Sequence, residues 1–129
     1  MLNEQMKNEL SELEKKIGEE KEALRTTMNV AFDLFTAINN KDFDYITSIS
    51  SSNVQVNEEE SIIYSNDNSY KIDHMNYTLE ILEYRYHHME NEKLTIGFAI
   101  YFSEGHYTIN FGFIKYNGQW LLDYLVFDV

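Results

Sequence analysis

The stretch HYTINFGFIKYNGQWLLDYLVFD, from His106 to Asp128, decides the fold of this chain. Apolar residues alternate on both sides of Asn117-Gly118, a dipeptide that predicts a two-residue β-turn because both residues tolerate positive φ. Such a turn pairs Tyr116 with Gln119 and fixes the register of the hairpin. One face of the hairpin then carries a continuous apolar set, which consists of Ile109, Phe111, Phe113, Trp120, Leu122, Tyr124 and Val126.

Two further strands are predicted before this hairpin. If Glu104-Gly105 is also a two-residue turn, the strand over 94–103 adds Ile96, Phe98, Ile100 and Phe102 to the same face. For the strand over 77–90, a three-residue turn at 91–93 or a bulge avoids burying Glu83 and Arg85, which would be costly. That register places Leu82, Tyr84, Tyr86 and His88 on the apolar face. We therefore expect an antiparallel meander of four strands over 77–90, 94–103, 106–116 and 119–128.

The opposite face of this meander is mixed, with small, polar and apolar residues. A sheet face of this kind is suited to packing on a partner. The residues that we expect in such a dimer contact are Tyr101, Thr108, Asn110, Asp123, Leu125 and Phe127.

The first 39 residues predict helix, because apolar residues recur at spacings of three, four and seven. On a heptad frame, Glu20 and Thr27 interrupt the apolar seam, and Gly18 weakens the helix by about 1 kcal/mol. Residues 1–23 are therefore expected to form a helical extension that packs on a partner chain or frays. Residues 24–129 are expected to form the globular domain, with the helix over 24–39 lying on the sheet.

The segment between helix and meander predicts smaller elements. Asn39-Asn40 ends the first helix, and a short second helix follows over 41–50, with Asp42 as its N-cap. Two short strands are expected on either side of residues 57–60. The run Ser65–Ser69 is dense in turn-forming residues and is interpreted as a turn.

Composition limits the function. The chain has 129 residues, which suits one domain, and 43% of them are hydrophobic, which is enough for a packed core. A net charge of −12 argues against nucleic acid or an anionic membrane as the main partner. The absence of Cys excludes disulfides and thiolate metal sites. No segment resembles a signal peptide or a membrane span, so we expect no membrane insertion and a cytoplasmic location.

The order of elements resembles the NTF2-like cone fold, an α+β (cystatin-like) architecture of helices on a curved antiparallel sheet. The residues that carry the resemblance are the helix-break-helix stretch FTAINNKDFD at 35–44 and the closing hairpin with Trp120. The resemblance covers about 25–129. The superfamily includes SnoaL-like cyclases and ketosteroid isomerase, and it contains both enzymes and non-enzymes. It implies an apolar pocket inside the cone and, for many members, dimerisation through the outer sheet face.

The resemblance gives little support to catalysis. Isomerase-type members use an Asp base on the strand after the second helix. Here that position holds Asn57, followed by Glu58, and the run Glu58–Glu60 is more typical of a solvated turn. His88 with Asp128 is the remaining acid–base pair that the predicted face suggests. We expect no catalytic residue, metal or cofactor, and take as pocket-lining candidates Tyr84, Tyr86, His88, Phe98, Phe111, Trp120 and Tyr124.

The sequence thus favours a non-catalytic binding or assembly module that is homodimeric and holds a small hydrophobic ligand in an aromatic cone. One alternative is an isomerase, dehydratase or cyclase that acts on a small hydrophobic substrate. Another is the soluble extracellular domain of a surface-anchored or secreted bacterial protein, with residues 1–23 as a stalk.

Overall fold

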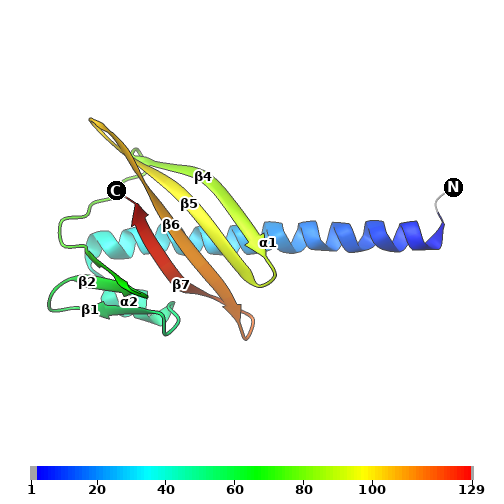
Figure 1. Cartoon of the computed structure of the whole chain (residues 1–129), viewed down its shortest axis with the longest axis horizontal. Coiled ribbons are helices and arrows are strands. Elements are labelled where there is room, and N and C mark those ends of the chain that lie inside the picture. Colours follow the sequence, from blue (N-terminus) through cyan, green and yellow to red (C-terminus); the bar gives the residue numbers. More distant parts are fainter. Residues whose placement is uncertain (1–2, 129) are drawn as a thin grey trace.

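A computed structural model describes residues 3–128 and shows a long helix packed across one face of a four-stranded antiparallel sheet (Figure 1). A short helix and a three-stranded sheet lie beside its last strand. The elements are α1 (Glu4–Asn40), α2 (Phe43–Ser48), β1 (Val54–Asn57), β2 (Ile62–Ser65), β3 (Asn68–Lys71), β4 (Leu82–Glu90), β5 (Lys93–Phe102), β6 (Gly105–Tyr116) and β7 (Gln119–Asp128). The predicted α+β class is confirmed.

Helix α1 is continuous but has two environments. It begins at Asn3, whose side chain accepts a hydrogen bond from the Met6 N–H, and it ends where Lys41 adopts a left-handed conformation. Every side chain from Glu4 to Glu22 is exposed, and burial begins at Ala23. The first half of α1 therefore extends beyond the sheet, and the second half packs on it (Figure 1).

The closing hairpin has the predicted turn. Tyr116 pairs with Gln119, and both Asn117 and Gly118 have positive φ. The preceding turn differs, because Phe102 pairs with Gly105, so the two loop residues are 103 and 104. This is a shift of two residues in register, which preserves the faces of the strand because side chains alternate with period two.

A bulge in β7 reverses part of the predicted face. Leu122 lies opposite Phe113, but Tyr124 lies opposite Gly112, so Asp123 is the extra residue. Beyond the bulge, the inward residues are Leu125 and Phe127, both buried, whereas Tyr124 and Val126 point to the other face. The prediction that Leu125 and Phe127 belong to a dimer face was therefore wrong, as was the inward placement of Tyr124 and Val126.

A second bulge has the same effect in β4. Glu90 pairs with Lys93, so the turn has two residues, and the register shifts between Tyr84 and Tyr86. The bulge keeps Tyr84 on the inner face, opposite Phe98, as predicted. Tyr86 and His88 lie on the outer face instead, opposite Gly97 and Thr95. The expected bulge is confirmed, and the predicted faces of these last two residues were wrong.

Aromatic side chains fill the space between α1 and the sheet. The Phe35 ring meets the rings of Phe98, Phe111 and Tyr77 at centroid distances of 5.2 Å. Phe98 and Phe111 are almost completely buried. Close-packed rings at these distances leave no room for a ligand among them.

The small sheet and α2 pack along the edge of β7. Ser51 N–H donates to the Leu122 carbonyl, and Leu122 N–H donates to the Ile49 carbonyl. The buried Ser65 hydroxyl accepts a hydrogen bond from Leu125 N–H.

Strand β3 was not predicted. Only residues 66 and 67 form the turn, and Ser65 pairs with Asn68 across it. Asp42 caps α2 as predicted, accepting from Tyr45 N–H.

Asn39, near the end of α1, holds the loop before β4. Its side-chain amide donates to the Tyr77 carbonyl and its side-chain oxygen accepts from the Tyr77 N–H, both at 2.6 Å. The side chain therefore pairs with the loop backbone as a strand would. Strand β4 begins at Leu82 and not at residue 77 as predicted, because a turn closed by the hydrogen bond from Ile81 N–H to the Thr78 carbonyl lies between them.

We predict that Asn39→Ala lowers the free energy of unfolding by about 1–3 kcal/mol, because a half-buried backbone N–H and C=O lose their partners. Urea denaturation followed by circular dichroism measures the change. The exposed neighbour Asn40 provides a matched control, and Asn40→Ala is expected to change stability by less than about 0.5 kcal/mol. Equal stability of the two variants would contradict the role given to Asn39.

Candidate binding surface on the outer face of the sheet

The outer face is the side of β4–β7 that points away from α1. None of the described helices packs on it (Figure 1). Two rows of paired residues cross its centre from β4 to β7. One row begins with His88 and ends with Tyr124, and the other begins with Tyr86 and ends with Val126. The same face carries Thr95, Gly97, Ala99, Tyr101, Thr108, Asn110, Gly112, Ile114 and Leu121.

Two tyrosines lie flat across this face, each above a glycine. The Tyr86 ring covers Gly97, and its hydroxyl donates to the Asn110 side-chain oxygen at 2.6 Å. The Tyr124 ring covers Gly112, and its hydroxyl forms a 2.7 Å hydrogen bond with the Thr95 hydroxyl. A Cβ at either glycine would overlap the ring above it. Glycine at these two strand positions is thus explained by close approach of an aromatic side chain.

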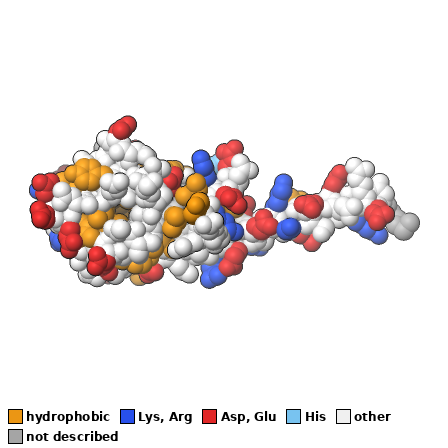
Figure 2. Space-filling view, turned by 90° about the horizontal axis from the view of Figure 1, so that it is seen from below, with side chains coloured by type: hydrophobic (Ala, Val, Ile, Leu, Met, Phe, Trp, Pro, Cys, Tyr) orange, Lys and Arg blue, Asp and Glu red, His pale blue; other side chains and the backbone are white. Residues whose placement is uncertain are grey.

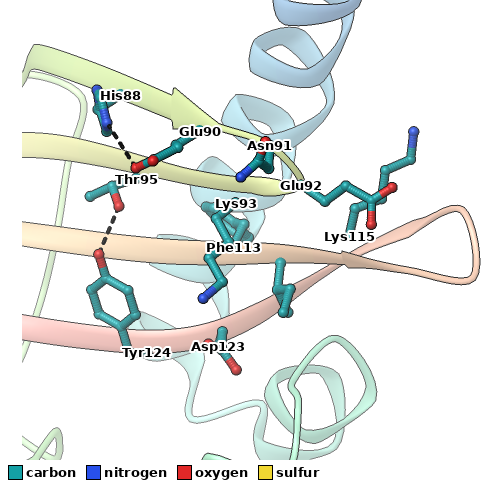
Figure 3. A pocket seen from close by; sticks show the side chains of 11 residues that line it. His88, Glu90, Asn91, Glu92, Lys93, Thr95, Phe113, Lys115, Asp123 and Tyr124 are labelled. Atoms are coloured by element: carbon teal, nitrogen blue, oxygen red, sulfur yellow. Dashed lines mark hydrogen bonds and ion pairs between the residues drawn. The ribbon is translucent and has the colours of Figure 1, made fainter.

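A hollow of about 730 Å³ opens at one end of the outer face, beside Tyr124. Figure 3 shows its walls, with Thr95 and Tyr124 joined on one side and His88 next to Glu90 on another. Carboxylates and amines both line it, from Glu90, Glu92, Asp123, Lys93 and Lys115. This mixture does not select an ion of one sign. The His88–Glu90 contact is 3.9 Å long and both side chains are more than 70% exposed, so it contributes little.

Asp123 has a structural role at the border of this face. Its Oδ1 accepts hydrogen bonds from the Ser51 hydroxyl at 2.7 Å and from the Asn53 side-chain amide at 3.0 Å. These bonds join the bulge in β7 to the turn between α2 and β1. Of the predicted dimer contacts, Tyr101, Thr108, Asn110 and Asp123 lie on or beside the outer face.

The predicted pocket residues do not form one site. Phe98, Phe111 and Trp120 are buried in the core, and Tyr86, His88 and Tyr124 are on the outer face. Tyr84 is on the inner face but remains half exposed at the edge, where its hydroxyl bonds to His87 Nδ1. The bulges separate these residues, because each one moves the following side chains to the opposite face.

The candidate acid–base groups are also apart. His88 lies opposite Thr95, whereas Asp128 lies opposite Thr108 on β7. The predicted pair is therefore not formed. Glu58 is exposed in the β1–β2 turn, and the Asn57 side chain accepts the Glu60 N–H in that turn.

The interior holds few polar groups. Between residues 3 and 128, the buried polar residues are Thr27, whose hydroxyl donates to the Ala23 carbonyl, and Ser65. Tyr77 and Tyr107 share a hydrogen bond of 3.3 Å near the mouth of the core. Burial, with a smaller effect of Tyr107, raises the pKa of Tyr77 well above its usual range, so it stays protonated. Two neutral hydroxyls can orient a polar group, but they do not remove a proton without a base.

A contact that the sequence did not predict links α1 to β4. His87 Nε2 lies 3.3 Å from Glu20 Oε1, and His87 Nδ1 bonds to the Tyr84 hydroxyl. Adjacent His87 and His88 point to opposite faces, as the alternation of a strand requires.

No group of three or more His, Asp or Glu in the described part of the chain is arranged to hold a metal ion.

Comparison with known proteins adds no assignment: no family model, curated protein or solved structure matches the chain. In the part of the chain that the structure covers, no helix has both the length and the apolar character needed to cross a membrane.

We predict that Gly97→Ala lowers the free energy of unfolding by about 1–3 kcal/mol, because the methyl group displaces the Tyr86 ring and breaks its bond to Asn110. In a Tyr86→Ala background the same substitution should be neutral or stabilising, since Ala loses less conformational entropy than Gly on folding. A double-mutant cycle by urea denaturation measures this coupling. An equal cost in both backgrounds would show that the ring does not cause it.

Proposed function

We propose that this chain is a non-catalytic binding and assembly domain of NTF2-like architecture that acts as a homodimer through its outer sheet face. The carrying observation is the distribution of its aromatic side chains. Phe35, Phe98 and Phe111 fill the interior, whereas Tyr86 and Tyr124 are fixed on the surface. The proposal therefore places binding on the surface of the domain, not in a cavity of the cone.

The geometry of the tyrosines supports a protein contact. Tyrosine is enriched in protein interfaces because it offers a large, amphipathic surface with few rotatable bonds. Here the hydrogen bonds to Asn110 and Thr95 hold both rings in place before any partner binds. Less side-chain entropy would then be lost on association.

Apolar residues beside the rings support the same surface. Val126 lies opposite Asn110 and is the next residue of β7 after Tyr124 that points to the outer face. Ile114 pairs with Leu121 near one end of the same face. These side chains are partly exposed. A second copy related by a two-fold axis would cover them with the same set, which is the usual symmetry of a homodimer.

The enzyme alternative has weaker support. A base for proton abstraction has to lie within hydrogen-bonding reach of a substrate in a closed site. Glu58 is exposed in a turn, and His88 is exposed on the outer face. The hydroxyl pair of Tyr77 and Tyr107 has no carboxylate among its hydrogen-bond partners in the described residues.

We predict that Val126→Glu halves the molar mass of the full chain measured by multi-angle light scattering at micromolar concentration, because it places two carboxylates in the two-fold contact. Leu79→Glu is the matched control, because it adds the same charge away from the outer face. Leu79 lies in the loop before β4, where its side chain is 77% exposed. If both variants keep the mass of the unmodified chain, or if that chain is itself monomeric, the outer-face dimer is wrong.

A further inference from the structure

The exposed part of α1, residues 4–22, is here named the arm. Its apolar side chains Met6, Leu10, Leu13 and Ile17 are 45–55% exposed, and their spacings are four, three and four. This spacing places them in one stripe along the helix. Figure 2 shows the other side chains of the arm as a mixture of acidic and basic groups. An apolar stripe with charged flanks is the pattern of one strand of a coiled coil.

Glu20 interrupts the stripe, and the same heptad frame resumes in the packed half of α1. Its positions there are Leu24, Thr27, Ala31 and Leu34, which lie against the sheet. Thr27 fits there because its hydroxyl bonds to the Ala23 carbonyl in its own helix. One face of α1 is therefore covered by the sheet in its second half and uncovered in the arm. A second helix on the arm would take the place that the sheet occupies farther along.

A second copy of the arm matches this stripe in either direction. In an antiparallel pair, Met6 faces Ile17 of the other copy and Leu10 faces Leu13, so the four apolar residues of each arm are all paired. A parallel pair also aligns them, each with its own equivalent. The apolar residues alone therefore do not select a direction of pairing. That choice depends on the charged residues on either side of the stripe.

The flanking charges favour the antiparallel direction. In that register, Glu9 faces Lys16 of the other copy, and Lys7 faces Glu14. Two-fold symmetry doubles each attractive pair. In a parallel pair, Glu9 would face Glu14, and Lys16 would face Lys21, so both contacts would be repulsive.

The length of the arm agrees with the same register. Residue 3 of one copy reaches the level of Glu20 in the other, and Glu20 is the residue that contacts His87 on β4. The overlap therefore ends where the globular domain begins. We propose that the arm pairs with the arm of a second copy as a two-stranded antiparallel coiled coil, with Met6 opposite Ile17 and Leu10 opposite Leu13. This contact is separate from the outer face and does not depend on the proposed function.

Spin labels test the direction of pairing in the full chain. The chain has no Cys, so Gln5→Cys and Glu12→Cys each provide a unique labelling site at the same heptad position. Antiparallel pairing offsets the two labels along the axis by about 20 Å at residue 5 but by about 1.5 Å at residue 12. Pulsed electron paramagnetic resonance should therefore give a clearly longer distance at residue 5. Equal distances, or no intermolecular distance, would overturn the proposal.

Charge substitutions test the pairing independently, with the residue 5 label as the readout. Glu9→Lys should weaken arm association about tenfold, because it turns two attractive pairs into repulsive ones. Adding Lys16→Glu should restore it. Glu12→Lys is the control, because it makes the same charge change away from the seam. Stronger association in Glu9→Lys would indicate a parallel pair, and an equal effect of both substitutions would indicate no specific pair; either result overturns the proposal.

The two interfaces fail separately. If the outer-face dimer is wrong, Val126→Glu leaves the mass unchanged, yet the residue 5 distance is still observed. If the arm pairing is wrong, the labels at residues 5 and 12 give equal distances or none, whether or not Val126→Glu changes the mass.

Discussion

The packing of Phe35 against Phe98 and Phe111 is the contact on which the rest of the molecule depends. It joins the second half of α1 to the two central strands of the sheet, and its centroid distances of 5.2 Å leave no gap between these rings. The inner face also buries Phe113, Trp120 and Phe127. Tyr86 and Tyr124 lie on the outer face instead, because a bulge in each of β4 and β7 turns them away from α1.

Much of this fold follows from local signals in the sequence. The Asn117-Gly118 turn, the Asp42 cap and the helical periodicity of residues 4–40 each result from interactions between near neighbours, and all were predicted. Strand β3 was missed because its residues are polar and follow a turn. It forms through pairing with β2, and Tyr70 packs on Phe127, which is distant in sequence.

The candidate site was harder to predict, because two bulges decide it. Strict alternation places Tyr124 inside and Leu125 outside, and the single extra residue Asp123 reverses both. The sequence contained one usable signal: Gly97 and Gly112 lie in the middle of strands, where glycine is unfavourable unless a neighbour approaches closely. Tyr86 and Tyr124 are those neighbours. The positions of the bulges depend on tertiary contacts such as Ser51 with Asp123, which no local pattern reveals.

Two surfaces remain uncovered for related reasons. Helix α1 extends beyond the sheet, so its apolar stripe continues where no strand covers it. The sheet has two faces, and α1 covers only one of them. Each uncovered surface can be covered by its equivalent on a second copy. If both contacts form, the arms link outer-face homodimers further, into a closed tetramer when the two two-fold axes intersect at right angles and into an open row otherwise. The net charge of −12 opposes both contacts through general repulsion, whereas the paired charges of the arm favour one of them. Added salt screens both effects, so the outer-face contact should strengthen with salt relative to the arm contact.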